Sequence, residues 1–361
     1  MSHVSRIASF LPAFVPLALL PLGALAIGLG VPAVVAAWFP LLFLFVIVPV
    51  LDRVVGLDRT NPPDESAAEA LEAQRGYRVL TWIMVPAWLT FLAWAVGYVA
   101  THSLGVIATF GWLLSLGIAG GVAAINTAHE LIHKSGRWEP ALGGVLLSSV
   151  IYAGFKVEHL RGHHVHVSTP LDASTARYGQ SLYQFLPRAI WLNARNAWTL
   201  EAKRLHALGL PALHWRNELI GWYALSAVFA ASCAFAFGPW GLFAFVVQGL
   251  IAGGTLEIIN YVEHYGLERA QLADGRYERV THRHSWNASQ RVTNRMLFQL
   301  QRHSDHHANA RRRYQALRHH DDSPQLPTGY AGMLMLALIP PLWRRIVDPL
   351  VLQWRSTHGS Q

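Results

Sequence analysis

The chain has 361 residues, of which 52% are hydrophobic and only 14% are charged. Soluble domains carry about 25% charged residues, so this composition indicates a membrane protein rather than a soluble one. The single cysteine, Cys233, excludes an intramolecular disulfide, an all-cysteine zinc site and a four-cysteine iron–sulfur cluster.

Three long stretches of the chain contain no charged residue. They cover residues 7–51, 79–129 and 219–256. Each is long enough for two membrane-spanning helices of about 20 residues. Each also has a break near its middle, rich in Gly, Pro or polar residues, at 28–32, 101–103 and 238–241. We therefore predict an all-α integral membrane protein with six transmembrane helices in three hairpins, at 8–28, 32–51, 79–100, 104–126, 219–237 and 240–261.

In this arrangement every lysine and arginine lies on one side of the membrane. The segments before, between and after the hairpins carry 1, 4, 10 and 14 of the 29 basic residues, and the hairpin tips carry none. Positive charge stays cytoplasmic, so we expect both termini and the segments 52–78, 127–218 and 262–361 on the cytoplasmic side of a bacterial inner membrane. Contact with anionic lipid accounts for a pI near 9.9 without a nucleic-acid partner.

The polar segments between the hairpins contain further predicted helices. Asn61-Pro62-Pro63-Asp64 is typical of a turn or helix N-cap, and 66–78 reads as a helix leading into the third span. The apolar runs 142–155 and 332–343 are short, so we expect a buried helix and interfacial packing rather than further spans. Because these segments alternate with the spans, residues 1–361 are expected to form one catalytic domain with a helical cytoplasmic cap.

Nine of the 19 histidines fall into four clusters close to the ends of the predicted spans. The clustered histidines are His129 and His133; His159, His163 and His164; His264; and His303, His306 and His307. Residues four apart, or three and four apart, share a helix face, so 129/133, 159/163 and 303/306/307 can each converge on one point. The adjacent pairs 163/164 and 306/307 point in different directions and can serve two neighbouring metals.

Nine imidazoles are too many for one metal ion. His129-Glu130-x-x-His133 alone matches a zinc-protease motif with Glu130 as general base, but a catalytic zinc uses three protein ligands and leaves six histidines unexplained. Two irons use all nine and leave positions open for oxygen. A metal or proton transporter is a further alternative, which would place ionisable groups along several spans; here only Glu257 interrupts them.

Each cluster also contains a carboxylate next to a candidate ligand. Histidine ligands commonly donate their second N–H to a carboxylate, which fixes the tautomer and the ring orientation. We therefore expect four carboxylates to support the ligands: Glu130, Glu158, Glu263 and Asp305.

At these residues the sequence resembles the integral-membrane alkane 1-monooxygenases, relatives of the membrane fatty-acid desaturases and hydroxylases. The resemblance rests on the following motifs: Asn126-x-x-His129-Glu130-Leu131-x-His133-Lys134, Glu158-His159-x-Arg161-Gly162-His163-His164, Thr169-Pro170-x-Asp172, Asn260-Tyr261-x-Glu263-His264-Tyr265-Gly266, His284-Ser285-Trp286-Asn287, Leu300-Gln301-Arg302-His303-Ser304-Asp305-His306-His307 and Leu326-Pro327-Thr328-Gly329-Tyr330. The first two motifs alone would also fit desaturases, whereas the fourth and the long histidine motif are more specific to hydrocarbon hydroxylases.

The resemblance implies a di-iron centre on the cytoplasmic side and O2-dependent terminal hydroxylation of n-alkanes to primary alcohols. It carries over nine ligands: His129, His133, His159, His163, His164, His264, His303, His306 and His307. Electrons would come from a separate rubredoxin and its reductase, since the chain has no Cys-x-x-Cys pair and no Gly-x-Gly-x-x-Gly fingerprint. The expected docking residues for an acidic donor are Arg311, Arg312, Arg313 and Arg318, with lipid headgroups as the alternative partner.

Substrate selection must rest on cavity shape, because an alkane has no polar group. Leu44 in the second span falls where relatives can place a bulky residue that limits tunnel depth, so we expect it to help set the depth. Departures from the family pattern, such as Leu171 in place of a usual Glu, leave hydroxylation of aromatic methyl groups (xylene or cymene type) open as an alternative. A fatty-acyl desaturase or hydroxylase is the other alternative within the superfamily.

Overall fold

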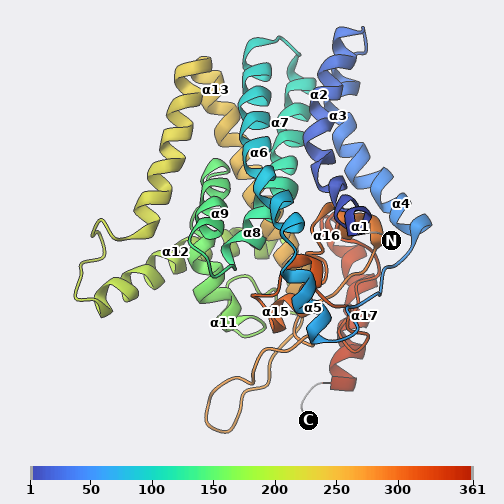
Figure 1. Cartoon of the computed structure of the whole chain (residues 1–361), viewed down its shortest axis with the longest axis vertical. Coiled ribbons are helices and arrows are strands. Elements are labelled where there is room, and N and C mark those ends of the chain that lie inside the picture. Colours follow the sequence, from blue (N-terminus) through green and yellow to red (C-terminus); the bar gives the residue numbers. More distant parts are fainter. Residues whose placement is uncertain (1–2, 359–361) are drawn as a thin grey trace.

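The computed structural model describes residues 3–358, and these residues form helices joined by loops and a few isolated β-bridges. Within that range five helices are long and apolar enough to cross a membrane: Ser5–Gly28, Ala33–Val55, Arg75–Thr101, Val106–Ile132 and Glu218–His264. Figure 1 shows the long helices side by side in the upper part of the molecule, with short helices and loops gathered below them. The multi-pass membrane architecture expected from the charge-free stretches is therefore present.

Several of the long helices contain segments of other helix types. The bounds are α1 His3–Ala8, η1 Leu11–Phe14, α2 Val15–Gly28, α3 Ala33–Leu42, η2 Phe43–Ile47, α4 Val48–Val55, α6 Arg75–Thr101, α7 Val106–Ala119, η3 Gly120–Ile125, α8 Asn126–Ile132 and α13 Glu218–His264. The predicted breaks at 28–32 and 101–103 are confirmed, because helices end and begin on either side of both.

The helix α13 corresponds to the last two predicted spans. It runs over 47 residues, but Gly238 within it has a non-helical backbone with φ of 68° and ψ of −164°. A straight helix of that length would measure about 70 Å, more than twice the roughly 30 Å of bilayer hydrocarbon. In Figure 1 α13 instead turns back on itself at the top of the bundle. Gly238 lies in the predicted break at 238–241 and supplies the positive φ that this turn requires.

Two helices extend beyond the spans predicted for them. The fourth helix continues past the predicted end at 126 to Ile132, and α13 continues past 261 to His264. No Gly or Pro occurs in 127–132 or 262–264, so nothing in the local sequence stops the helix. His129 and His264, which lie beyond the predicted span ends, are therefore on the last turns of long helices.

The remaining helices surround the lower end of the bundle. Their bounds are α5 Glu65–Glu72, α9 Trp138–Ser149, α10 Phe155–Glu158, η4 His159–His163, α11 His164–His166, α12 Leu182–Ala207, α14 Arg291–Met296, α15 His303–Ala308, η5 Tyr314–Ala316, α16 Tyr330–Ala337 and α17 Pro340–His358. Asp64 caps α5 as predicted, accepting a bond from the Ala67 amide at 2.8 Å. The single helix predicted over 66–78 is wrong, because the extended backbone of Gln74 separates α5 from α6.

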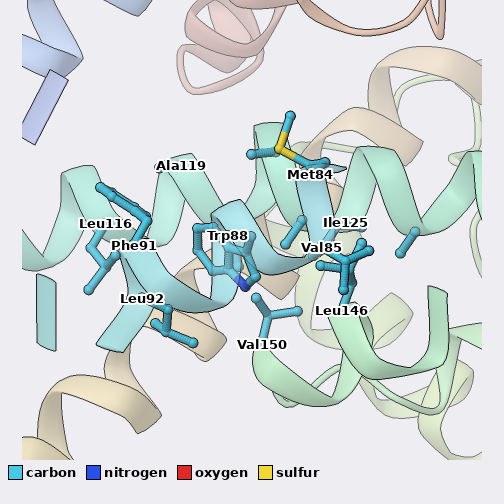
Figure 2. Packing of buried hydrophobic residues seen from close by; sticks show 14 of the residues in the cluster. Met84, Val85, Trp88, Phe91, Leu92, Leu116, Ala119, Ile125, Leu146 and Val150 are labelled. Carbon is cyan, nitrogen blue, oxygen red and sulfur yellow. The ribbon is translucent and has the colours of Figure 1, made fainter. Parts of the chain in front are cut away.

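A buried tryptophan sits at the centre of the main hydrophobic core. Trp88 of α6 is fully buried, and Figure 2 shows Phe91, Ala119, Ile125 and Val150 around it. Its indole N–H donates to Ser149 Oγ at 2.8 Å, so the ring is buried without leaving a polar group unsatisfied. This core joins α6, α7, η3 and α9, and thereby fixes the helix that carries His129.

Three segments of the described chain are π-helical, and all three lie at one place in the fold. They are η2 (Phe43–Ile47), η3 (Gly120–Ile125) and η4 (His159–His163). The first two contribute side chains to an apolar cavity, and the third carries two histidines of the cluster described below. Such insertions are rare and occur frequently at functional sites.

We predict that Gly249→Ala destabilises the helix packing, because a Cβ at this position of α13 would lie 2.8 Å from the Val150 carbonyl oxygen. Backbone cannot move aside as a side chain can, and overpacking of this kind costs about 1–3 kcal/mol. Thermal unfolding of the purified protein in one detergent measures the loss. Gly254→Ala on the same helix is the matched control, since a Cβ there meets nothing within 4 Å. Equal melting temperatures for the two variants would contradict the prediction.

Candidate metal centre

The nine clustered histidines come together in two groups below the long helices. The first group contains His129, His133, His159, His164 and His306, and the second contains His163, His264, His303 and His307. Within each group one nitrogen from every ring lies within 4.8 Å of all the others. The groups draw on α8, η4, α11, α13 and α15 and the residues beside them, so they unite segments that are far apart in the sequence (Figure 1).

The ring nitrogens face one another at a spacing that suits shared coordination. In the first group His133 and His164 place Nε2 at 3.0 and 3.1 Å from His159 Nε2. In the second group His307 Nε2 lies 2.9 Å from His303 Nε2 and 3.2 Å from His163 Nε2. Two nitrogens bound at right angles to one metal, at about 2.1 Å each, lie about 3.0 Å apart.

Hydrogen bonding cannot satisfy these nitrogens. A neutral imidazole has one N–H and one lone pair, so several Nε2 atoms pointing at a common centre cannot all be paired. His129 Nε2 is buried and has no hydrogen-bond partner among residues 3–358. Removing that much polar surface from water without a partner is unfavourable, and a metal ion at the centre of each group would receive the lone pairs. The donor set therefore fits two metal ions.

Burial also keeps six of these imidazoles in the neutral form that binds metal. It holds the pKa of His133, His159 and His164 well below the usual value of 6.5, with the neighbouring histidines adding to the effect. The same two causes lower the pKa of His303, His306 and His307. A neutral ring offers its lone pair without first losing a proton.

The predicted pairing of 159 with 163 on one helix face is wrong. His159 belongs to the first group together with His164, whereas His163 belongs to the second. The reason is the π-helical segment η4, in which residues five apart, and not four apart, are brought together by the backbone. The wider turn sends two consecutive histidines, His163 and His164, to different groups. His306 and His307 divide in the same way, as expected of an adjacent pair. The predicted convergence of 303, 306 and 307 on one point is therefore wrong, because only His303 and His307 share a group.

A carboxylate that the sequence did not single out orients one ligand. Asp172 Oδ2 lies 3.0 Å from His163 Nδ1, and Thr175 Oγ1 donates to the same oxygen at 2.6 Å. Burial opposes the ionised form, but the His163 and Thr175 contacts prevail and lower the pKa of Asp172. An ionised carboxylate only accepts, so the His163 proton sits on Nδ1 and its Nε2 lone pair faces the second group. The Thr169-Pro170-x-Asp172 motif was the available signal.

The four predicted carboxylates are less uniform than expected. Glu263 Oε2 lies 3.2 Å from His303 Nε2 and accepts a bond from the Tyr330 hydroxyl at 2.6 Å. Glu130 instead pairs with the Lys134 ammonium at 2.9 Å.

The other two predicted carboxylates, Glu158 and Asp305, lie near other charged groups. Burial and the nearby Asp172 carboxylate raise the pKa of Glu158. Asp305 forms a buried ion pair with Arg312 at 3.0 Å and also contacts His320.

Three of the four predicted docking arginines form ion pairs within the chain. Arg312 and Arg318 both reach Glu65, at 2.8 and 3.2 Å, and Arg313 pairs with Glu139 at 2.8 Å. Arg311 is exposed. A basic docking surface for a partner would therefore depend mainly on Arg311, because the positive charges of the other three arginines are paired with carboxylates of the same chain.

An apolar cavity opens onto both histidine groups. Its lining includes His129 and His159 from the first group and His303 from the second. Leu44, the predicted depth-setting residue, is buried and lines the same cavity. Most of the remaining lining is aliphatic or aromatic: Phe45, Val48, Ile118, Val122, Ile125, Phe155, Leu256, Ile259, Met296, Leu297, Leu300 and Leu334.

A second apolar groove adjoins this cavity. The two share four lining residues: Phe45, Ile118, Thr255 and Leu334. The outer part of the groove is formed by side chains exposed on the bundle surface, among them Phe39, Leu42 and Val46. The shared lining residues thus connect the cavity to a surface of the helix bundle on which apolar side chains are exposed.

A third group of possible ligands, His282, His320 and Asp322, has a different geometry. The rings of His282 and His320 stack face to face, 4.3 Å apart and only 11° from parallel. Lone pairs lie in the plane of each ring, so parallel stacked rings direct them side by side and not toward one ion. Arg283, 3.3 Å from Asp322, adds a positive charge that opposes a cation.

The histidine groups, the apolar cavity and the long helices define a membrane-embedded metalloprotein. The sequence profile of the fatty acid desaturase family matches residues 104–337. Alkane 1-monooxygenase 2 of Pseudomonas aeruginosa is 56% identical over 90% of this chain and 86% of its own length. Alkane 1-monooxygenase 2 of Alcanivorax borkumensis is 53% identical over 87% of this chain and 82% of its own length.

A more distant relative is the hydroxylase component of a xylene/toluene monooxygenase of Pseudomonas putida. It is 29% identical over 69% of this chain and 66% of its own length. The chain therefore belongs to the fatty acid desaturase family and, within it, to the alkane 1-monooxygenases.

We predict that Asp172→Asn weakens the second metal position about 10- to 100-fold, the usual cost of losing a carboxylate partner of a histidine ligand. The amide keeps the volume, but it no longer holds the His163 proton on Nδ1. Metal bound per chain after dialysis against a graded series of chelator concentrations measures the change. Asp322→Asn is the matched control, because Asp322 also bonds a histidine, His282, at 2.9 Å but lies outside the two groups. Equal metal retention in the two variants would contradict the role of Asp172 in orienting His163.

Proposed function

We propose that this chain is an oxidoreductase that hydroxylates the terminal carbon of n-alkanes, using O2 and two iron ions held by the nine histidines. The observation that carries the proposal is the contact of the apolar cavity with both histidine groups, at His129, His159 and His303. Relatives named alkane 1-monooxygenases, with more than 50% identity over about nine-tenths of the chain, support the same reaction.

Iron suits the donor set better than zinc does. Imidazole binds both, but zinc has no redox chemistry, and a catalytic zinc uses three protein ligands. Two bound irons would supply the oxidation: one atom of O2 enters a C–H bond, the other leaves as water, and two electrons and two protons arrive from outside.

The protein contributes orientation and exclusion of water. Its cavity walls are aliphatic and aromatic, so an unbranched hydrocarbon gains by leaving water and meets the histidine groups with one end. The substrate offers no polar handle, and one methylene is worth only about 1–3 kcal/mol in discrimination. Tolerance of several chain lengths follows from this.

A cytoplasmic location of the site follows from the distribution of charge. We count the two limbs of α13 on either side of Gly238 as separate passes, which gives six spans in three hairpins under a helical cap. All 29 basic residues then lie on the side of the histidines, the cytoplasmic side of the bacterial inner membrane.

Electrons must come from a separate protein. With Cys233 as its only cysteine the chain cannot build a rubredoxin-type iron site, and a rubredoxin supplied by its reductase fits this requirement. Docking near the third histidine motif is our proposal, with Arg311 as the exposed member of the arginine set.

Other chemistries are less well supported by the site. Among the described residues that line the cavity there is no lysine or arginine to hold a carboxylate, which disfavours a free fatty acid as substrate. Glu130, the base that a zinc protease would need, forms an ion pair with Lys134.

Hydroxylation of aromatic methyl groups is supported by the xylene/toluene monooxygenase relative. Products from whole cells given n-alkanes of several lengths alongside p-xylene separate the two: preferred turnover of p-xylene would favour the aromatic reaction.

We predict that His264→Ala lowers bound iron from two ions per chain toward one and reduces conversion of octane to 1-octanol at least tenfold, because a group of four donors becomes three. Iron per chain and turnover with a reconstituted electron donor are measured on the same sample. His206→Ala, at an exposed position of α12, should leave both unchanged. Full iron loading with unchanged turnover in His264→Ala would remove His264 from the ligand set, and one zinc per chain in the parent protein would overturn the proposal.

The substrate is proposed to arrive from the bilayer through the second groove. Leu44 and Phe45 are neighbours in the π-helical segment η2, but they stand at different places: both line the cavity, whereas only Phe45 also lines the groove. Leu44 would then limit how far a chain extends inside, and Phe45 would narrow the passage through which it enters.

We predict that Leu44→Trp and Phe45→Trp have different effects, so each serves as the control of the other. The first shortens the chain length at which kcat/KM is greatest, because the larger ring fills the inner cavity. The second raises KM two- to tenfold for every chain length and leaves the optimum in place. A series of n-alkanes from C6 to C16 measures both. If kcat/KM and KM varied with chain length in the same way in both variants, the separate roles proposed for Leu44 and Phe45 would be wrong.

A further inference from the structure

The polar side chains in the wall of the apolar cavity are almost all engaged within the protein. Thr255 donates to the Ile251 carbonyl oxygen of its own helix at 2.7 Å. Asn260 Nδ2 donates to Glu257 at 3.2 Å. Thr293 bonds Asp52, and Tyr330 bonds Glu263. None of these groups needs a partner from the cavity.

Asn126 is different. Its side chain lines the cavity and is 5% exposed, and its amide Nδ2 is buried with no hydrogen-bond partner. Among the cavity-lining residues of the described chain, His129 shares this condition through its Nε2 and His303 through its Nδ1. Both of these residues belong to the two histidine groups. The lone pair of His129 is accounted for by the metal, whereas an amide N–H is a donor that no metal satisfies.

The position of Asn126 places this donor next to the reacting end of the cavity. Asn126 and His129 are three residues apart on α8, so their side chains share one face of the helix, one turn apart. An unpaired buried amide is costly, and apolar alkane offers it nothing. A group that carries oxygen and binds close to the first histidine group would satisfy it.

We propose that Asn126 binds the hydroxyl group of a primary aliphatic alcohol, so that the cavity is also an alcohol-binding site. The inference rests on the proposed function, in which this alcohol is the product. The amide has both a donor and an acceptor end, and a hydroxyl can bond to either, so the argument holds for both orientations of the side chain. The alcohol therefore stays in the cavity longer than the alkane from which it forms, and competes with it.

Direct binding tests the proposal without any turnover. The metal-loaded protein is reconstituted in nanodiscs and kept without an electron donor, so that neither ligand is oxidised. Saturation binding of radiolabelled n-octane, 1-chlorooctane and 1-octanol is measured, with empty nanodiscs subtracted. 1-Chlorooctane resembles 1-octanol in length but lacks the hydroxyl group, and with it the oxygen to which the Asn126 amide would donate. The parent protein should bind 1-octanol about tenfold more tightly than the other two.

Asn126→Leu replaces the amide with an apolar group of similar shape, and should weaken 1-octanol about tenfold while changing n-octane less than twofold. Thr255→Val is the matched control, because the Thr255 hydroxyl also lines the cavity but is already bonded to its own helix, and it should change neither affinity. Asn126→Ala serves the same purpose if the Leu variant does not fold.

The outcomes separate the two proposals. Equal weakening of octane and octanol in the Asn126 variants, or no effect on octanol, would overturn the alcohol site, whatever the enzyme does in turnover. A parent protein that forms no octanol from octane, yet loses octanol affinity on substitution of Asn126, would retain the site and overturn the proposed reaction instead.

Discussion

Convergence of nine imidazoles in two small volumes is the constraint on which the rest of the structure depends. Lone pairs that face one another at about 3 Å, in a largely buried site, repel unless a cation lies between them. The fold must therefore supply enough packing free energy to hold these rings in place. The core around Trp88, which packs against α8, and the hydrogen bond between His163 and Asp172 show how this is done.

Much of this arrangement could be predicted from the sequence because its causes are local or compositional. Charge-free stretches with a break near the middle located the long helices, since the bilayer imposes a length and forbids charge. Histidines at helical spacing indicated metal ligands because few other functions require so many imidazoles together. Asp64 as an N-cap was equally readable from a short motif.

What could not be predicted depends on backbone geometry and on distant pairing. Spacing of four suggested that 159 and 163 share a metal, but the π-helical turn of η4 separates them, and no residue in His159–His163 signals such a turn. Glu130 stands beside His129 in the sequence but faces Lys134, whereas Asp172, nine residues beyond His163, supports a ligand. Proximity along the chain was a poor guide to which carboxylate meets which ring.

The groove beside η2 has a consequence for how affinity should be expressed. Its outer side chains, such as Phe39 and Val46, are exposed and apolar, so the proposed route begins in lipid. A site filled in this way responds to the mole fraction of hydrocarbon dissolved in the membrane, and hardly at all to its concentration in the surrounding buffer. Adding vesicles at a fixed amount of alkane lowers the concentration of alkane within the membrane. A Michaelis constant expressed per litre of water then depends on how much lipid is present, although the protein itself is unchanged.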